Sequence, residues 1–240
     1  MRVLLLLSIL LLMGDVGGMS AWAAAKLELS PEKIDFGRVP QYTKYSHKVV
    51  LKSTGDIPVE IHKVNSYCDC ILVPIQKATI KPGDSLIIEI TFSSGSYSSN
   101  HEWRPHFYYN GPKRDIYLRV LADIVIDHQK LKPIHVHPHS VVASQYGDST
   151  KHEFEFNIIS VSDEPVPLEL IYNDDEFYDL DFPLYVLPYD TAVGKIILND
   201  KGVESEFEKS IIFEYIDAKS KKIHYSIPVR RRIFIPKGSR

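Results

Sequence analysis

Residues 81–90 read KPGDSLIIEI, a turn sequence followed directly by a run of apolar residues, and this stretch decides the fold. Pro82, Gly83 and Asp84 are residues that tight turns favour, because proline presets the backbone and glycine accepts a positive φ. The run from Ser85 to Phe92 is rich in isoleucine and leucine, as buried strands are. The stretch therefore predicts a turn that opens a β-strand.

The same pattern occurs twice in the chain, displaced by about 100 residues, which is the length of one small domain. The second copy has LPYD at 187–190 before KIIL at 195–198. Two further echoes are LELSP at 27–31 with IHVHP at 134–138, and PVEI at 58–61 with PLEL at 167–170. Two copies of one module are the simplest explanation, and the polar stretch 127–133 is the predicted join.

Inside each copy the apolar residues alternate with period two, and no segment beyond the N-terminus has convincing helical spacing. Short strands separated by turn residues predict an all-β fold, with two tandem immunoglobulin-like antiparallel β-sandwiches of about seven strands each. The predicted divisions are a signal peptide at 1–25, a sandwich at 26–126, a linker at 127–133, a diverged sandwich at 134–236 and a tail at 237–240.

The N-terminus has the layout of a secretory signal peptide. Arg2 supplies a positive charge, residues 3–13 are apolar except for one serine, and small residues follow, with a cut plausible after Ala23 or Ala25. The apolar run is shorter than the roughly 20 residues that span a bilayer. No cysteine lies near the cut, so we expect no lipid anchor and no membrane span in the mature chain. The expected location is the periplasm or the cell exterior.

Composition and motifs argue against two classes of function. The net charge is −3, and residues 230–232 are the only basic run, whereas a duplex-binding domain carries a basic stripe. We therefore expect no nucleic-acid partner. The chain also lacks a G-x-S-x-G elbow, a glycine-rich phosphate loop and an H-E-x-x-H pair. The expectation is that the protein is not an enzyme.

Cys68 and Cys70 are the only two cysteines of the chain. In a straight strand their Cα atoms would be about 6.6 Å apart on one face, at the far end of what a disulfide tolerates, with Asp69 on the opposite face. Three interpretations stay open: a disulfide formed across a bent backbone, a pair of thiolates that binds Cu(I), or two small apolar side chains at the sandwich edge.

A second candidate metal site is formed by His135, His137 and His139, which alternate along the sequence. On one strand their imidazoles would share a face, as a Cu(II), Ni(II) or Zn(II) site requires. Pro138 interrupts this ladder, and the alternative is an exposed face of the opening strand.

Carboxylates are concentrated in one loop of the second copy. Asp174, Asp175, Asp179 and Asp181 surround Glu176, and oxygen ligands of this kind can hold Ca²⁺. Their spacing fits no EF-hand, and the alternative is a solvated acidic loop.

Five short motifs occur in order in the first copy: IDFGRV at 34–39, STGDIP at 53–58, CDC at 68–70, IKPGD at 80–84 and ITF at 90–92. In this order they resemble a bacterial secreted Ig-like family of unknown function with a Cys-Gly-Cys core, allied to the ASH, MSP and hydin immunoglobulin-like domains. The resemblance covers residues 27–126 and implies an exported β-sandwich with no established activity. The chain departs from the family at Tyr67, Asp69 and Ile71, where the family has serine, glycine and threonine.

These observations predict a protein-binding or scaffolding module of the periplasm or cell envelope, with a protein partner and no required cofactor. Exposed sheet edges can accept a strand from such a partner. The alternative is a copper or thiol-redox accessory protein that uses Cys68 and Cys70, with Cu(I) as its ion.

Overall fold

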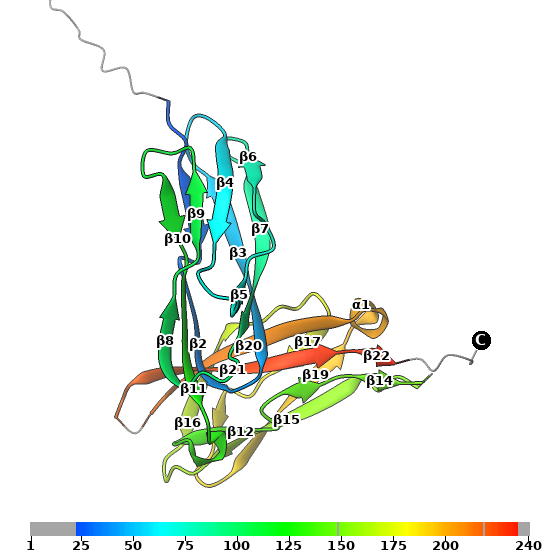
Figure 1. Cartoon of the computed structure of the whole chain (residues 1–240). Coiled ribbons are helices and arrows are strands. Elements are labelled where there is room, and N and C mark those ends of the chain that lie inside the picture. The colour runs from blue at the N-terminus through cyan, green and yellow to red at the C-terminus, as the bar shows by residue number, and fades with distance from the viewer. Residues whose placement is uncertain (1–22, 148, 218, 235–240) are drawn as a thin grey trace, which may run out of the picture.

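The computed structural model describes residues 23–147, 149–217 and 219–234. The predicted signal peptide up to residue 22 and the predicted tail lie outside the described residues. The chain folds into two β-sandwiches, and Figure 1 shows the first standing upright on the second, which lies across its lower end. This confirms the predicted all-β fold with two Ig-like sandwiches.

The upper part of the first module is a sandwich of two four-stranded sheets, ordered β1-β3-β7-β5 and β10-β9-β4-β6. The KPGD turn leads into β7, which pairs with β3 on one side and β5 on the other. The bounds are β1 Leu27–Ser30, β3 Lys44–Ser53, β4 Val59–Asn65, β5 Ile71–Leu72, β6 Ala78–Ile80, β7 Ser85–Ser93, β9 His106–Tyr109 and β10 Asp115–Tyr117.

The second module has a four-stranded sheet of its own, ordered β12-β15-β19-β17. Its other strands belong to a small sheet, β14-β22, and to a large sheet that it shares with the first module. The bounds are β12 Ile134–His137, β13 Val141–Val142, β14 Gln145–Tyr146, β15 Glu153–Ser160, β16 Val166–Tyr172, β17 Tyr178–Asp181, β18 Tyr185–Val186, β19 Thr191–Leu198, β20 Phe207–Ile216, β21 Lys222–Arg231 and β22 Ile233–Phe234.

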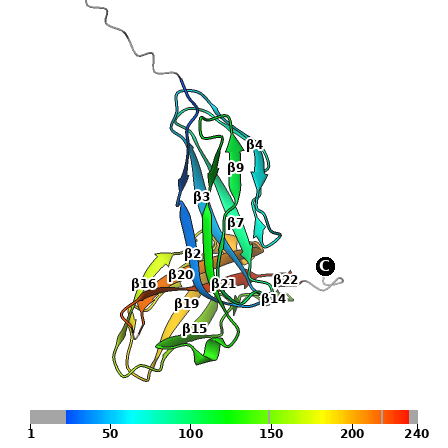
Figure 2. The same cartoon turned by 60° about the vertical axis from the view of Figure 1, so that its left-hand side comes forward.

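The shared sheet runs from one module into the other in the order β18-β16-β20-β21-β2-β11-β8, with β13 beside β21. The first module contributes β2 (Lys33–Pro40), β8 (Ser99–Trp103) and β11 (Arg119–Val125). Arg38 of β2 pairs with Tyr225 of β21, and this pairing joins the two halves of the sheet. Figure 2 shows β2 descending to β20 and β21, which run across its lower end.

Gly37 makes the close approach of β2 to β21 possible. A Cβ atom at this position would lie 2.1 Å from the carbonyl oxygen of His224, and the backbone φ is +61°. The register of β2 against β11 shifts at this point, as at a β-bulge. Only glycine tolerates both the contact and the left-handed backbone. The D-F-G stretch is therefore where the second module docks on the first.

Each module has its own hydrophobic core. The first centres on Phe36, Tyr45 and Phe92, and the second contains Phe213 and Tyr225, all fully buried. A further residue crosses the boundary, because Ile212 of β20 is packed into the first core. Burying one isoleucine contributes about 1.5–3 kcal/mol, so the junction has an apolar component.

Two short helical segments occur between the strands. One is helix α1 (Asp200–Glu204), and the Asn199 side chain caps it by accepting from Gly202 N at 2.9 Å. A single 3₁₀ turn, η1 (His128–Lys130), lies in the predicted linker. Within the described ranges, no helix is long and apolar enough to cross a membrane.

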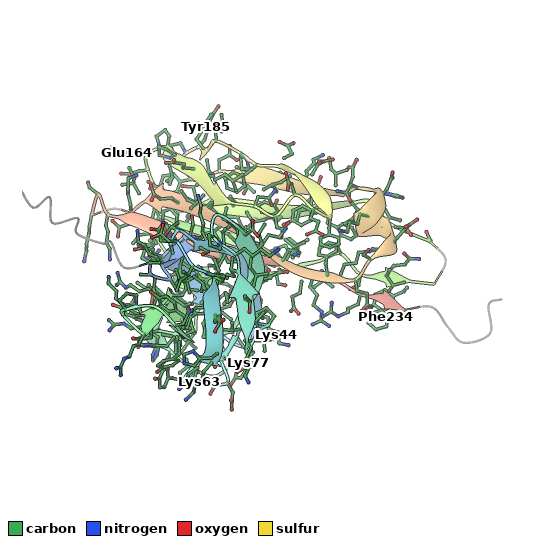
Figure 3. All side chains as sticks on the ribbon, turned by 90° about the horizontal axis from the view of Figure 1, so that it is seen from above. Lys44, Lys63, Lys77, Glu164, Tyr185 and Phe234 are labelled. Carbon is green, nitrogen blue, oxygen red and sulfur yellow. A yellow bond between two sulfur atoms is a disulfide. The ribbon has the colours of Figure 1, made fainter. Side chains whose placement is uncertain are left out.

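The second module is elongated. Figure 3, seen from above, shows Glu164 and Tyr185 at one end of it and Phe234 towards the other, while Lys63 and Lys77 lie on the first module. The two modules therefore present separate surfaces, and they meet along β2, β3, β20 and β21.

Candidate functional site

Residues 66–70 form the turn that carries the chain from one sheet of the first module to the other. The turn follows β4 and leads into β5, which pairs with β7. Cys68 and Cys70 are joined by a disulfide, with their Cα atoms 5.2 Å apart. Asp69 and Cys70 lie in the turn, so the straight-strand geometry considered for Asp69 does not apply. The bend brings the two sulfur atoms together.

Backbone hydrogen bonds hold this disulfide turn against the core. Ser93 N donates to the Cys70 carbonyl at 2.8 Å, and Ser66 Oγ donates to the Cys68 carbonyl at 3.1 Å. Cys70 is buried and Cys68 is half-buried, whereas Asp69 is exposed. While the disulfide is closed neither sulfur is a thiolate, so this state offers no pair of sulfur ligands to a metal.

The three histidines do not continue along one strand. His135 and His137 lie in β12, which ends at His137, and His139 lies beyond it. His137 is exposed and the other two are half-buried. Throughout the described part of the chain, no three His, Cys, Asp or Glu side chains gather as a metal site requires.

The acidic loop is divided between two environments. Asp174 is buried, and its two carboxylate oxygens lie 2.9 Å from Lys48 Nζ and 2.9 Å from Lys209 Nζ. In contrast, Asp175, Asp179 and Asp181 are exposed. The expectation of a solvated loop is therefore wrong for Asp174, because lysines from two other strands neutralise it in the junction.

The ion cluster at the junction links both modules. Lys48 also pairs with Glu176 at 3.0 Å, Lys209 also pairs with Glu89 at 2.9 Å, and Lys201 contacts Glu176. Lys48 and Glu89 belong to the first module and the other members to the second. We call this set of three lysines and three carboxylates the ionic clamp. Neutral hydrogen bonds support it, with Ser46 N donating to Ser210 Oγ at 2.9 Å.

The lysines shift the acid–base properties of the ionic clamp. Burial acts to raise the pKa of Asp174, but the hydrogen bonds and charges of Lys209 and Lys48 outweigh it and leave that pKa lowered. Lys201 and Lys48 lower the pKa of Glu176 to about 2. The lowered pKa values keep Asp174 and Glu176 ionised near neutral pH, and lysines of both modules lie beside these carboxylates, so we interpret the clamp as structural.

Strand β8 (Ser99–Trp103) has an open sheet edge. Strand β8 pairs with β11 from Ser99 opposite Ile124 to Trp103 opposite Val120. On its other side it pairs with no strand of the described chain, and Figure 1 shows it at the outer edge of the first module. The edge is open because β4 ends at Asn65, opposite His106, and the chain then leaves this sheet through the disulfide turn.

Aromatic side chains cover the core side of this open edge. His101 stacks on Trp103 with ring centroids 5.3 Å apart, and Tyr97 meets Trp103 at 5.8 Å. Trp103 also packs on Phe92 of the first core at 4.8 Å. Tyr97 is 42% exposed, and the other two rings are half-buried. At this edge of the sandwich the three rings are only partly covered, and an added strand would cover them further.

The sequence analysis did not single out β8 as a site. The available signal was the Arg104–Pro105 break between β8 and β9, because proline interrupts a strand. The partners of Asp174 were also missed, since Lys48 is 126 residues away along the chain.

Part of the first module is similar to a known domain family. Residues 25–123 match the family model described as HYDIN/CFA65/VesB-like, Ig-like domain. No curated protein matches the chain.

Solved structures are similar at low scores. A protein of unknown function from Porphyromonas gingivalis W83 is 10% identical with a TM-score of 0.37, covering 85% of this chain and 99% of that one. The ASH/PapD-like domain 7 of human CEP192 is 11% identical with a TM-score of 0.37, covering 53% and 98%. The E. coli chaperone DraB is 9% identical with a TM-score of 0.34, covering 84% and 95%.

Proposed function

We propose that the chain is a non-enzymatic binding module of the periplasm or cell envelope that captures an extended segment of a protein partner along β8. The observation that carries this proposal is the unpaired edge of β8 above half-buried aromatic rings. A partner strand added there would gain backbone hydrogen bonds from β8, and its alternate side chains would cover Tyr97, His101 and Trp103. The partner segment should therefore carry apolar residues at every second position.

Site-specific crosslinking tests this proposal. A photo-crosslinking amino acid at Asn100, exposed in β8, should give one discrete adduct in cells, whose partner peptide has the alternating apolar pattern. The same group at His62, exposed on β4, serves as the control position. His101→Glu should abolish the Asn100 adduct because it places a charge against the partner's apolar residues. Equal adducts at both positions, or an adduct that His101→Glu leaves unchanged, would contradict the proposal.

Packing at the first described residues supports one of the two candidate cleavage sites. Ala25 is 1% exposed, the Ala24 carbonyl accepts from Asp56 N at 3.1 Å, and Ala23 is exposed. A cut after Ala25 would remove a buried side chain and this backbone bond, whereas a cut after Ala23 keeps both. Export would then release a chain that begins at Ala24. The intact mass of protein from the cell envelope fraction tests this, and a chain beginning at Lys26, or an uncut chain, would contradict it.

The alternative function is a thiol-redox or copper accessory role, and the closed disulfide on a surface turn is the observation that favours it. Reduction would free Cys68 and Cys70, and two thiolates two residues apart in sequence are suited to Cu(I). Copper stoichiometry of the reduced protein, compared with Cys68→Ser/Cys70→Ser, tests this role. Cysteine-independent copper content would exclude it. The Cys-x-Cys element, together with the motif order of the first module, supports membership in the bacterial secreted Ig-like family.

A further inference from the structure

A row of aromatic side chains lies on the outer face of the sheet β10-β9-β4-β6. The strand register places Asn65, His106 and Tyr117 side by side across three strands. The neighbouring row is Lys63, Tyr108 and Asp115. Because side chains alternate along a strand, both rows point away from the core.

Tyr67 of the disulfide turn extends this surface. Its ring meets His106 edge-on with centroids 5.4 Å apart, and its hydroxyl lies 2.7 Å from the Tyr108 hydroxyl. Tyr67 has a φ of +59°, which non-glycine residues seldom adopt. The turn thus holds an exposed ring beside the sheet. We call Tyr67, His106, Tyr108 and Tyr117 the aromatic platform.

The rings of the platform are close together and accessible. His106 lies 6.0 Å from Tyr108 and 5.3 Å from Tyr117, measured between ring centroids. Tyr67 is 64% and Tyr117 43% exposed. These spacings are comparable with the length of one pyranose unit, so successive sugar rings could lie on successive side chains.

Polar groups surround the rings. Asp115 Oδ2 lies 2.6 Å from His106 Nδ1, and this contact directs the other imidazole nitrogen away from Asp115. Lys63 Nζ lies 5.5 Å from the Tyr108 centroid, and the Arg104 guanidinium lies 5.5 Å from the Tyr117 centroid. Hydroxyl, imidazole and carboxylate groups together can both donate and accept hydrogen bonds, as sugar hydroxyls require.

A groove of about 640 Å³ continues from the platform past β10. It shares His106, Asp115 and Tyr117 with the platform, and its far wall is the segment Ala24–Leu27. Lys113 lies in its lining. The groove adjoins the platform through these shared residues, so a ligand that lies on the rings would continue into it.

The charges around the platform favour an anionic ligand. Among the described residues Lys63, Lys113 and Arg114 form no salt bridge, and they outnumber the two carboxylates of this surface that pair with no lysine or arginine, Asp115 and Glu32. Arg104 and Arg119 share the single carboxylate of Glu102. These two arginines and one glutamate therefore carry a net charge of +1. A ligand with regularly spaced carboxylates would complement these cations.

We propose that the aromatic platform and the adjoining groove bind an acidic glycan, a chain of pyranose sugars that carries carboxylates. The C–H faces of the sugars lie on the rings of Tyr67, Tyr108 and Tyr117, and the carboxylates meet Lys63 and Arg104. Tyr117 and Asp115 lie on β10, the edge strand of this sheet, so an extended acidic peptide is the competing ligand that the test must distinguish. This binding is independent of strand capture at β8.

Titration of the full chain with tetragalacturonate, followed by calorimetry, tests the proposal. Tyr117→Ala should weaken binding about tenfold, as loss of one aromatic contact does. The double variant Tyr117→Ala/Lys63→Gln should bind more weakly still. Tyr189→Ala is the matched control, because Tyr189 is 73% exposed and outside the platform; it should bind normally. Thermal melting of each variant confirms that it folds.

Four outcomes would overturn the proposal. The first is no heat of binding with tetragalacturonate at millimolar concentration. The second is equal affinity for a neutral tetrasaccharide such as maltotetraose, and the third is equal affinity for a polyglutamate peptide. The fourth is an equal loss of binding in Tyr189→Ala. The His101→Glu variant should bind the glycan normally, so failure here and failure of strand capture are distinguishable.

Discussion

The two modules carry different turns at the same place in the fold. Residues 66–70 follow β4 and lead into β5, which pairs with β7. Residues 173–177 follow β16, the copy of β4, and lead into β17, which pairs with β19, the copy of β7. The first turn is closed on itself by a disulfide. The second is held by lysines of β3 and β20.

The disulfide stabilises one module locally, whereas the ionic clamp joins the two modules. We call the junction held by the ionic clamp the joint. The disulfide turn needs nothing outside the first module, because its covalent bond and its backbone partner Ser93 belong to that module. Asp174 and Glu176 each form an ion pair with Lys48 of the first module, at 2.9 Å and 3.0 Å. The two corresponding turns are therefore stabilised differently. The turn of the first module is stabilised within that module, and the turn of the second module is stabilised by contacts to the first.

Removing a buried lysine should break the joint with the largest effect. Lys209 is 5% exposed at its side chain, and Lys209→Met leaves Asp174 and Glu89 without it. Breaking a buried pair from one side costs about 3–5 kcal/mol, measurable by urea unfolding. Lys201→Met is the control, because Lys201 is 55% exposed and pairs with Glu176 only; it should cost about 0–1 kcal/mol. Equal losses would mean that the clamp is not buried in solution.

Acid should weaken the joint and leave the disulfide turn closed. The pKa of Glu176 is about 2 in the folded chain against an ordinary 4.5, and the pKa of Asp174 is also lowered. The folded chain therefore holds its charges where the unfolded chain takes up protons, so the stability they contribute is present above pH 4.5 and is lost as the pH falls towards 2.

The melting temperature measured between pH 6 and pH 2 tests this effect. Asp174→Asn/Glu176→Gln should show a smaller fall over that range than the unmodified protein, and the difference isolates the clamp from other carboxylates. Identical falls in the two proteins would show that these carboxylates do not titrate with unfolding.

Opening the disulfide should cost less than breaking the joint. Cys68→Ser/Cys70→Ser removes a very short closed loop, for which chain-entropy arguments give about 1–2 kcal/mol. Thermal unfolding measures this loss, and the acid sensitivity of the variant should match that of the parent because the clamp is intact. A loss as large as that of Lys209→Met would place the disulfide among the main supports of the fold.

The smallest expected effect is that of Tyr67→Gly. Glycine accepts the left-handed backbone of this position without strain, and this gain offsets the lost contact with Tyr108. The net change in unfolding free energy should stay within about 1 kcal/mol, as measured by urea unfolding. Tyr67→Val, which suits this backbone poorly, should be less stable than the glycine variant.

The sequence was sufficient to predict the sandwiches, because the strand period and the turn residues are local signals. KPGD before β7 and its echo before β19 needed no knowledge of distant contacts. The shared sheet was not predictable in this way. It depends on Gly37 meeting His224 and on Ile212 entering the other core, and neither contact leaves a periodic pattern in the sequence.

The candidate sites divide along the same line. Cys68 and Cys70 were recognisable because both partners lie in one turn. The burial of Asp174 was not, since an aspartate in an acidic stretch has the same sequence signature whether solvent or two lysines surround it. The open edge of β8 depends on where another strand, β4, ends.

The joint also affects the order in which the chain folds. Ser226 Oγ donates to the Phe36 carbonyl across 190 residues of sequence, and Arg38 reaches Tyr215 across 177. Contacts of such separation close slowly because the chain must first bring its ends together. The first module can therefore form its core, apart from Ile212 of β20, while the rest of the chain is still being synthesised. Lys48 and Glu89 are therefore exposed to solvent until β20 and β21 fold against the first module, and the junction forms last.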